Sequence, residues 1–384
     1  MHVFLTGKPA CGKTTLIKEL LKYIKNCRGF FTEEIRENNQ RVGFKVITLI
    51  GNEAIFAHKD FNFPYSVGKY KIDIDSFNKI AIRELKEALE ENCEIVVIDE
   101  IGKMEVLSQE FKKICLEILD KRRVLGTISI IEEPFIRTIK GRKDVCILEV
   151  TKENFLQIKE KVLLAINSLP VEKIRLLESA AYKLGFEERI LIENASSSLT
   201  EEIEKLNLGK NILVIAGKGN NGADVLSSAR KLLVRGYNTK IAIVTDGQLN
   251  KEVLFQKSIL EKINAPLYII DESKMKELER LISDADCVID GLLGIGINKE
   301  VCGITKETIK LINKFSKKVI ACDIPSGLEP NEGIVLGEAI EADFTITFLA
   351  PKDGFFLGEG RKFCGKIIVK DIGISKEILE KHID

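Results

Sequence analysis

The chain has 384 residues, and its 58 Lys and Arg balance 58 Asp and Glu, so the formal net charge is zero. With 45% hydrophobic residues, 30% charged residues and 8 Pro, the composition is that of a globular protein and excludes a disordered or fibrous one. Zero net charge argues against a general surface for nucleic acids or membranes, and the length favours two large domains.

No apolar run approaches the roughly 18 residues that span a bilayer, and the start of the chain lacks the pattern of a signal peptide. We therefore expect a cytoplasmic protein with neither a membrane nor a nucleic-acid partner. Nine Cys without a C-x-x-C pair are typical of buried thiols, and three scattered His argue against a histidine-based site. The sequence leaves both a monomer and a homo-oligomer open.

Strand-like runs alternate with amphipathic stretches along the whole chain, which predicts an α/β fold with largely parallel sheets. Pro170 stops a helix predicted over Lys152–Asn167, so the domain boundary is expected at Ser168–Pro170. The predicted domains are 1–168 and 171–384. Before that helix, the first is expected to contain a helix near Lys13–Lys25 and strands near His2–Thr6, Phe30–Glu34, Val42–Leu49, Ile95–Asp99, Val124–Ile130 and Val145–Val150.

The second series opens with a helix predicted over Val171–Leu184. Its apolar runs again have the length of buried strands and are separated by helical stretches. The strands are expected near Ile212–Ala216, Thr239–Thr245, Leu267–Ile270, Cys287–Asp290, Val319–Asp323, Thr345–Leu349 and Lys366–Val369. No short-period repeat links the two halves.

The segment Gly7–Thr14 matches G-x-x-x-x-G-K-[ST] after a strand and before a helix, the context that a phosphate-binding loop requires. Its glycines let backbone N–H groups wrap phosphates at the start of the helix. Lys13 is expected to act in catalysis by reaching the β- and γ-phosphates, and the Thr14 hydroxyl suits Mg²⁺.

A buried-strand run ends in Asp99 and Glu100. In phosphate-loop enzymes, an Asp at such a strand end holds Mg²⁺, so Asp99 is the second expected ligand. Glu100 is placed to orient or deprotonate the attacking water. A kinase would carry the same loop and acid, so the residues leave hydrolysis and transfer to a second substrate open.

GKPACGKTT, RGFFTEEIR, RVGFKVITL, VGKY and IDEIGKMEVLS resemble the small nucleoside-triphosphatase family first described in thermophiles, over about residues 1–168. The resemblance implies Mg²⁺-dependent hydrolysis of nucleoside triphosphates such as ATP and GTP. Arg142 matches a basic position of the family, and it either neutralises transition-state charge or is an ordinary surface Arg. The implied nucleotide-binding residues are Gly7, Lys8, Pro9, Ala10, Cys11, Gly12, Lys13 and Thr14, and Asp99, Glu100, Ile101, Gly102, Lys103, Met104, Glu105 and Val106.

In the second half, Gly217–Gly222 reads G-x-G-x-x-G after a strand, and Asp246 follows at about the spacing of a dinucleotide-binding fingerprint. Taken alone, this pattern would indicate an NAD-dependent oxidoreductase. The only His of this half is His382, so a proton relay for hydride transfer is missing.

Three polar segments lie at predicted strand ends: Asn220–Asp224, Asp290–Gly296 and Asp323–Gly327. The carboxyl ends of parallel strands meet at one edge of a sheet, where ligands bind. Amide, carboxylate and hydroxyl oxygens from these segments suit a hard cation. Each segment alone reads as an ordinary turn, whereas the three together indicate a site.

GKGNNGAD, VIDGLLGIGI, DIPSGLEPNEG, TFLAPKDG and KDIGI, with ESAAYKLG and LIENAS before them, resemble the NAD(P)H-hydrate epimerase family, or YjeF N-terminal domain, over about residues 171–384. The resemblance implies a Rossmann-like three-layer α/β/α domain that interconverts the R and S forms of hydrated NADH or NADPH. It implies K⁺ bound by Asn221, Asp290 and Ser326. The implied substrate-binding residues are Asn220, Asn221, Gly222, Ala223, Asp224, Gly294, Ile295, Gly296, Ile297, Asn298, Lys299, Glu300 and Asp323.

Epimerisation at C6 of the hydrated ring needs proton transfer, and Asp224, followed by Asp323, is our choice of acid and base. The family usually reads GNNGGDG, and Ala223 and Val225 replace two of its glycines. If their side chains crowd the pocket, the domain would sense a dinucleotide without converting it. The dehydratase often fused to this family is absent from the sequence, so a separate dehydratase is expected as a partner.

Overall fold

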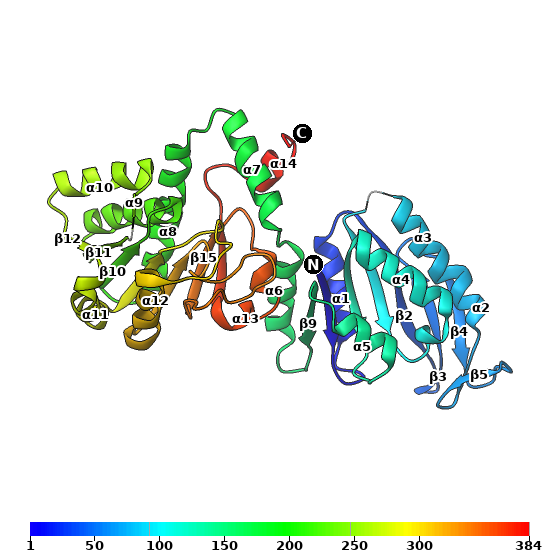
Figure 1. Ribbon diagram of the computed structural model, residues 1–384. Coiled ribbons are helices and arrows are strands. Elements are labelled where there is room, and N and C mark those ends of the chain that lie inside the picture. The colour runs from blue at the N-terminus through cyan, green and yellow to red at the C-terminus, as the bar shows by residue number, and fades with distance from the viewer. Residues whose placement is uncertain (92, 246, 384) are drawn as a thin grey trace. The chain divides into compact units, whose positions relative to one another are not determined.

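The computed structural model describes residues 1–91, 93–245 and 247–383 and divides into two compact units, Met1–Ile166 and Asn167–Asp384. Figure 1 shows the first unit in blue to teal and the second in green to red. Asp246, the acid of the predicted dinucleotide fingerprint, lies outside the described residues. Among the helices of the described chain, none has the length and apolarity to cross a membrane.

In the described part of the first unit, strands form one sheet in the order β5-β6-β4-β3-β2-β7-β8-β1-β9. β1 (His2–Thr6) pairs in parallel with β8 (Arg123–Ile128) and β9 (Val145–Glu149). β7 (Ile95–Ile101) pairs in parallel with β8 and β2 (Cys27–Glu37). Most consecutive residues of β1 and β7 are buried, as expected for parallel strands covered on both faces.

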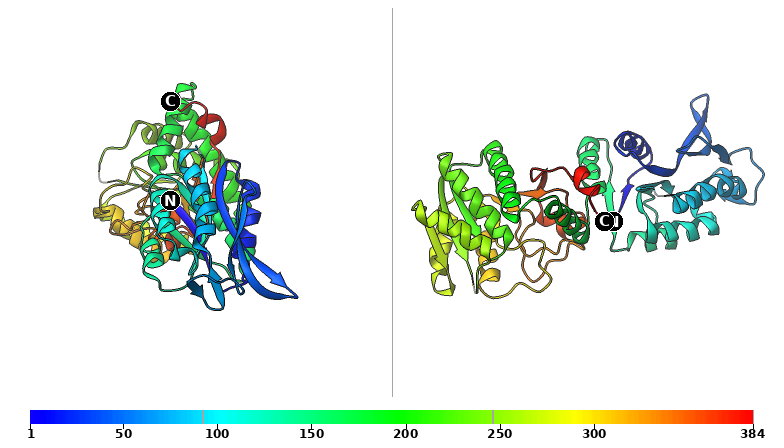
Figure 2. Two further views of the ribbon diagram at one scale, coloured as in Figure 1. Left: turned by 90° about the vertical axis from the view of Figure 1, so that its right-hand side faces the viewer. Right: turned by 90° about the horizontal axis from the view of Figure 1, so that it is seen from above.

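An antiparallel edge extends this sheet, with β3 (Gln40–Thr48), β4 (Glu53–His58), β6 (Tyr70–Ile72) and β5 (Tyr65–Val67). The sequence pattern predicts a largely parallel sheet, and this edge is the departure from it. A two-residue turn at 38–39, with φ of 46° and 62°, joins β2 to β3. Such a turn joins only antiparallel strands, because a parallel connection needs a dozen or more residues. Figure 2 shows this hairpin in blue.

Helices cover the first sheet and complete its core. Phe30, Phe77 and Phe111 meet edge to face within it, with ring centroids 5.6–6.2 Å apart. The helices are α1 (Lys13–Leu20), α2 (Ile74–Phe77), α3 (Arg83–Glu90), α4 (Gln109–Lys121), α5 (Pro134–Lys140) and α6 (Phe155–Ile166). A π-helical segment, Asn78–Ile82, joins α2 to α3.

The described strands of the second unit form an all-parallel sheet in the order β12-β11-β10-β13-β14-β15-β16. They are β10 (Asn211–Ala216), β11 (Asn238–Val244), β12 (Leu267–Ile270), β13 (Cys287–Gly291), β14 (Val319–Cys322), β15 (Phe344–Phe348) and β16 (Lys366–Lys370). The helices are α7 (Val171–Lys183), α8 (Glu188–Leu206), α9 (Asn220–Val234), α10 (Lys251–Lys262), α11 (Met275–Asp284), α12 (Gly303–Phe315), α13 (Gly360–Phe363) and α14 (Lys376–Glu380).

Alternate residues of β10 point into two separate cores. Val214 packs with residues of α7–α10 on one face of the sheet, whereas Leu213 and Ile215 pack with α11 and α12 on the other. This arrangement confirms the three-layer α/β/α fold expected for the second half. The strand order reverses between β10 and β13, and a crevice forms at the carboxyl ends of strands at such a point.

The start of the second unit is tied to residues far along the chain. The Ser168 hydroxyl donates to the Asp353 carboxylate, and Leu169 N donates to the carbonyl of Pro351 at 2.9 Å. Val171 N, at the start of α7, donates to Asn331 Oδ1 at 2.8 Å. Hydrogen bonds therefore hold the start of the second unit to the chain segments that precede and follow β15.

Candidate functional site

The phosphate-binding loop lies between β1 and α1 and depends on its glycines. Gly7 has a φ of 144°, and a Cβ atom there would lie 2.5 Å from the carbonyl oxygen of Val150. Gly12, at φ 99°, precedes α1, and among the described residues no side chain caps this helix end. The N–H groups of the first turn therefore remain open to an anion, as a nucleotide phosphate requires.

Lys13 lies over this loop. Its Nζ donates to the carbonyl oxygen of Gly7 at 3.1 Å and to that of Lys8 at 3.5 Å. The ammonium group is therefore held where the loop would wrap phosphates. Its charge also faces Asp99 and Glu100, where it favours the ionised carboxylates.

Asp99 is 1% exposed at the carboxyl end of β7. Burial raises the pKa of its carboxyl, against hydrogen bonds from the hydroxyls of Thr127 and Thr14 and the charge of Lys13. Its Oδ2 is buried without a hydrogen-bond partner among the described atoms. A buried carboxylate oxygen of this kind, beside the Thr14 hydroxyl, fits a divalent cation that supplies the missing interaction.

Two further acids follow Asp99 in the same segment. Burial raises the pKa of Glu100, and it raises that of Glu105 to about 8 with help from the charge of Glu100. Glu105 Oε2 accepts a hydrogen bond from Gly102 N at 3.1 Å. Both carboxylates flank Gly102, since a Cβ there would lie 2.9 Å from Glu105 Oε2 and 3.0 Å from Glu100 Oε1. The segment therefore concentrates buried carboxyl groups beside the phosphate loop.

The remaining residues of the two predicted stretches differ in how they are presented. Lys8, Pro9, Ala10 and Lys103 are exposed, so their side chains are open to a ligand. Ile101 and Val106 are buried in the core, which leaves only their backbone for contact. Cys11, Met104 and the other members lie between these extremes or have been described above.

Arg142 does not reach the phosphate loop. Its guanidinium pairs with Asp144 and Asp120, at 2.9 Å each, just before the start of β9. Asp144 also pairs with His2, the first residue of β1, at 3.2 Å. Because β1 and β9 are parallel, this cluster lies at the amino end of β1, and the loop follows its carboxyl end. The interpretation of Arg142 as a transition-state partner is therefore wrong, and it is a structural ion-pair residue.

The second site is a cavity of about 510 Å³ at the switch point of the second sheet. Side chains of α7 and α8 form one side of it, and the start of α9 with the loop after β13 forms another. Asp323, after β14, and Lys352, after β15, complete the wall. The cavity thus lies where the strand order of a parallel sheet predicts a ligand.

Asn221, Asp290 and Ser326 meet beside this cavity. Ser326 Oγ donates to Asp290 Oδ1 at 2.6 Å, and Ser326 N donates to Asp290 Oδ2 at 2.9 Å. Asn221 Nδ2 donates to the carbonyl of Leu293 at 2.8 Å, and Asn221 Oδ1 is buried without a partner among the described atoms. Burial raises the pKa of Asp290 to about 6. An unpartnered amide oxygen beside a carboxylate and a hydroxyl fits a monovalent cation.

Four carboxyl groups line the cavity: Glu178, Glu188, Asp224 and Asp323. Burial and then the charge of Asp323 raise the pKa of Glu178, and the same two causes raise that of Asp224 well above its ordinary value. Asp323 accepts a hydrogen bond from the ammonium of Lys352, which is 1% exposed. Its φ of 63° is uncommon outside glycine, and such strain clusters at functional sites.

The predicted binding residues divide into three groups. Asn220, Asn221, Asp224, Gly294, Ile295, Gly296, Ile297 and Asp323 line the cavity. Gly222 lies behind it, where a Cβ would lie 2.2 Å from the carbonyl of Gly217, so only glycine fits. Asn298, Lys299 and Glu300 are exposed beyond its wall, and Glu300 faces Lys306 at 3.6 Å.

Ala223 and Val225 do not crowd the cavity. Both are fully buried in the core between α9 and the sheet, and neither belongs to the cavity wall. The methyl groups of Val225 lie against Gly291, within 2.6 Å of where a Cβ of that glycine would be. The sequence left open whether these two side chains crowd the pocket, and the structure places them in the core, where the helix turns them away from the crevice.

Sequence reasoning missed the roles of Glu178, Lys352 and Thr127. The first two stand in segments that carry the family resemblance, ESAAYKLG and TFLAPKDG, and this was the signal that could have drawn attention to them. Thr127 has no such signal, since its bond to Asp99 depends on the neighbouring strand.

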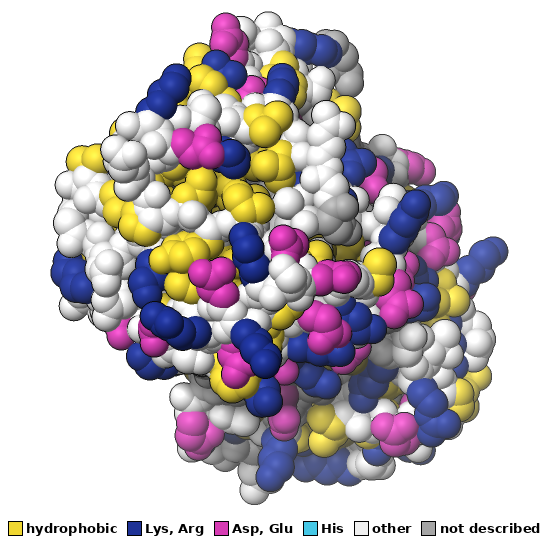
Figure 3. All heavy atoms as spheres, turned by 60° about the vertical axis from the view of Figure 1, so that its left-hand side comes forward, with side chains coloured by type: hydrophobic (Ala, Val, Ile, Leu, Met, Phe, Trp, Pro, Cys, Tyr) yellow, Lys and Arg dark blue, Asp and Glu magenta, His cyan; other side chains and the backbone are white. Residues whose placement is uncertain are grey.

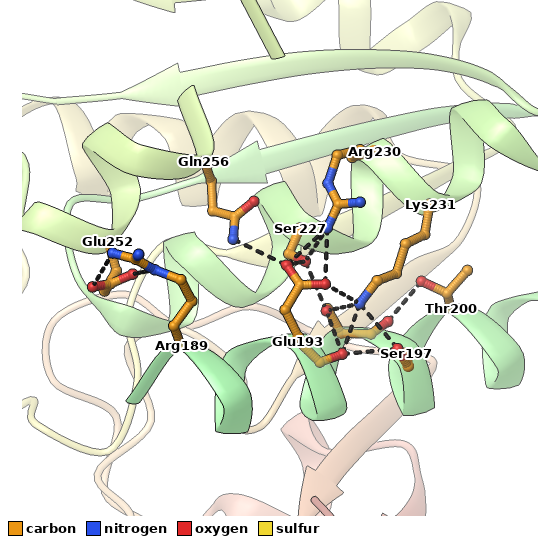
Figure 4. Close-up of polar contacts among 10 residues, drawn as sticks. Arg189, Glu193, Ser197, Thr200, Ser227, Arg230, Lys231, Glu252 and Gln256 are labelled. Atoms are coloured by element: carbon orange, nitrogen blue, oxygen red, sulfur yellow. Dashed lines mark hydrogen bonds and ion pairs between the residues drawn. The ribbon is translucent and has the colours of Figure 1, made fainter. Parts of the chain in front are cut away.

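A polar network joins α8 to α9 and α10 (Figure 4). Glu193 accepts hydrogen bonds from Ser227 at 2.9 Å, Arg230 at 2.8 Å and Gln256 at 3.2 Å, and Lys231 Nζ lies 3.0 Å from its Oε2. Partial burial opposes ionisation of Glu193, but these partners outweigh it and lower its pKa to about 2. The network holds together the two helices, α8 and α9, whose other residues line the cavity.

Figure 3 draws one face of the molecule with its side chains coloured by type. On that face Lys and Arg alternate with Asp and Glu, and hydrophobic side chains gather in one area. The described residues drawn there form no extended patch of one sign. This face therefore does not offer the basic stripe that nucleic-acid binding requires.

Comparison with known proteins adds family relationships to this geometry. The family described as NTPase matches residues 2–163, and the family described as YjeF-related protein N-terminus matches residues 188–354. The nucleoside-triphosphatase THEP1 of Thermotoga sp. (strain RQ2) is 43% identical over 164 residues, which cover 42% of this chain and 94% of that protein.

Two relatives match the second unit. The NAD(P)H-hydrate epimerase of Elusimicrobium minutum (strain Pei191) is 35% identical over 216 residues, which cover 55% of this chain and 97% of that protein. The bifunctional NAD(P)H-hydrate repair enzyme Nnr of Thermofilum pendens (strain DSM 2475 / Hrk 5) is 34% identical over 213 residues. That match covers 55% of this chain and 41% of the longer protein.

A phosphate-loop unit followed by an α/β/α unit with an acid-lined crevice defines an enzyme with two nucleotide-handling domains. The chain belongs to the THEP1 nucleoside-triphosphatase family through its first unit and to the NAD(P)H-hydrate epimerase family through its second.

Proposed function

We propose that the first unit hydrolyses nucleoside triphosphates such as ATP and GTP to diphosphate and phosphate. The observation that carries this proposal is the meeting of Lys13, Thr14 and Asp99 at one loop, with the buried Oδ2 of Asp99 unpartnered among the described atoms. Loop N–H groups and Lys13 bind the phosphates, and Glu100 orients the attacking water. Water attacks the γ-phosphorus, and the bond between the β-phosphate oxygen and the γ-phosphorus breaks. The nucleoside diphosphate leaves, and the water oxygen stays on the released phosphate.

Thr14 and Asp99 would hold Mg²⁺ in this unit. The ion would neutralise charge on the phosphates, as in other phosphate-loop enzymes. Hydrolysis is favoured over transfer to a second substrate by membership of a family of nucleoside-triphosphatases.

We further propose that the second unit interconverts the R and S forms of hydrated NADH or NADPH. The observation that carries this proposal is the cavity lined by Asp224 and Asp323, in which the charge of Asp323 raises the pKa of the buried Asp224. Carboxyl groups that differ in their surroundings can serve as acid and base in one site.

The substrate carbon C6 carries a hydroxyl group and the ring nitrogen. Asp323 accepts the hydroxyl proton, the C6–N bond breaks with its electron pair on nitrogen, and Asp224 gives that nitrogen a proton. The resulting carbonyl turns, nitrogen attacks its other face, and both protons return. No oxidant or reductant is consumed. Asn221, Asp290 and Ser326 would hold K⁺, which would add positive charge beside the cavity.

The test uses the full chain and two assays. Phosphate release from ATP and GTP should occur with Mg²⁺ and stop with a chelator; transfer to an acceptor without free phosphate would instead indicate a kinase. Purified R-hydrate of NADH should convert to the R/S mixture, seen by chromatography, faster with K⁺ than with Na⁺. Binding without conversion would contradict the epimerase proposal and indicate a sensor. Dehydration of the S form would need a separate dehydratase, and we expect one as a partner.

A further inference from the structure

Lys352 is a buried cation in the wall of the second cavity. Its side chain is 1% exposed, and its Nζ donates to Asp323 Oδ1 and to Thr347 Oγ1, the latter at 2.6 Å. Thr347 Oγ1 in turn donates to Asp323 Oδ1 at 3.1 Å, and Phe348 N donates to the same oxygen at 3.3 Å. One carboxylate oxygen thus receives three donors from the end of β15 and the loop after it.

Burial of an ammonium group costs several kcal/mol unless a charged partner compensates it. Asp323 is that partner, and its side chain is 17% exposed, so the pair is screened little by water. Removing one member of such a pair leaves the other charge uncompensated. The end of β15 and the loop after it therefore fix the position of the Asp323 carboxylate.

The other acids of the cavity are arranged differently. Asp224 and Glu178 both face the charge of Asp323, and that charge disfavours their ionised forms. The charged and titratable groups that face the pair across the cavity are Arg175, Glu178 and Tyr182 on α7, Glu188 on α8, Lys218 after β10 and Asp224 on α9. Of the carboxylates around the cavity, Lys352 bonds directly to that of Asp323.

We propose that Lys352 is a positioning residue for the epimerisation, holding the Asp323 carboxylate in the orientation of the proton acceptor, with Asp224 as the proton donor in the same cavity. This inference rests on the proposed epimerase function. In the forward step the hydroxyl proton moves to Asp323 and the proton of Asp224 moves to nitrogen, so the net charge of the cavity does not change. Lys352 neither gives nor takes a proton in this step and does not contact the reacting atoms.

The experiment compares Lys352→Met with Lys352→Arg and with the exposed control Lys362→Met in the full chain. Lys352→Met should lower kcat for epimerisation by about a hundredfold with KM little changed, because the base is lost and binding is not. The acidic limb of its pH profile should move to higher pH, because removal of a neighbouring cation disfavours a carboxylate. Lys352→Arg should recover part of kcat and return the limb toward its original position.

A purely structural role would produce a different pattern. If Lys352→Met lowered kcat while the acidic limb stayed in place, or if the double variant Lys352→Met/Asp323→Asn recovered both stability and kcat, the inference would be overturned. The double variant should recover folding, because no buried charge is left alone, and should remain as slow as Asp323→Asn.

A second measurement does not depend on activity. Carbon-13 NMR of the aspartate carboxyl groups, with the Asp323 signal assigned from Asp323→Asn, follows this carboxyl group directly in the wild type and in the variant. In Lys352→Met its titration should move to higher pH. An unchanged titration would overturn the inference even in an active enzyme. An inactive wild-type chain with the expected titration would contradict the epimerase proposal alone.

Discussion

The two units each gather carboxyl groups beside the carboxyl edge of a sheet, but they compensate the charge differently. In the first, Asp99 and Glu100 lie at the end of β7 and Glu105 follows it, and Lys13 faces the first two with its Nζ bonded to backbone carbonyls. That cluster retains an unpartnered buried oxygen among the described atoms. The first site is therefore built for positive charge that arrives with its ligand.

In the second site, a buried side chain of the protein itself compensates part of the negative charge. Glu178, Asp224 and Asp323 come from three separate segments, and the buried Lys352 bonds to one of them. Under the proposed functions, the two acid clusters would suit different chemistry: the first would collect a cation and phosphates, and the second would separate a proton donor from an acceptor.

The largest effect is expected at Asp224. Asp224→Asn keeps the size of the side chain but removes the proton donor, so epimerisation should slow by about 10²–10⁴-fold. Chromatographic assay of the R/S conversion measures this, with Glu277→Gln as an exposed control. Phosphate release by the first unit should be unaffected. Full epimerisation by Asp224→Asn would show that Asp224 is not the proton donor, and the contrast between the two clusters would then fail.

Lys13→Ala should produce the next largest effect. The substitution removes the only lysine bonded to the loop carbonyls among the contacts described, so phosphate release should fall by about 10²–10³-fold. Lys22→Ala, an exposed lysine just after α1, is the matched control. If added Mg²⁺ restored full activity to Lys13→Ala, the positive charge of the bound ion would be enough for phosphate release, and the role given to Lys13 would be wrong.

Ala223→Gly tests whether the side chain of Ala223, which lies behind the second cavity, restricts the space for the ligand. Ala223 is fully buried in the core and inside a helix, so glycine should lower the free energy of unfolding by about 1 kcal/mol. Epimerisation should stay within about twofold of the wild type, because the side chain does not reach the cavity. A large gain in kcat would instead revive the argument that Ala223 crowds the ligand.

The smallest effect is expected at Glu193, outside both clusters. Its pKa in the folded chain is lowered to about 2 from an ordinary value of 4.5, so the folded state binds fewer protons than the unfolded one between these values. Its stabilisation should be complete above pH 4.5 and lost as the pH falls toward 2. Calorimetry of Glu193→Gln should show a deficit that shrinks over this range, unlike that of the exposed control Glu201→Gln. A deficit independent of pH would contradict this assignment.

The parts of the molecule that follow from local pattern could be predicted from sequence. The phosphate loop, the acids after β7 and the strands of the second unit are runs or motifs within a few residues of chain. The antiparallel edge of the first sheet was missed because β4, β5 and β6 are short, and because the pairing of the longer β2 and β3 is set by the hairpin turn between them. Glu178 and Asp323 come together across 145 residues of chain, and no periodicity records that distance. For Arg142 the sequence left a transition-state partner and an ordinary surface Arg both open, because a matching position says nothing about the end of the sheet at which it lies.

The bonds that tie the start of the second unit to its far end have a consequence during synthesis. Ser168 and Asp353 are 185 residues apart in sequence, whereas the first unit ends at Ile166. A ribosome adds roughly 5–20 residues per second, so α7 would wait on the order of 10–40 s for its partners to be made. During that interval the start of the second unit lacks the hydrogen-bond partners that Asn331 and Asp353 later supply.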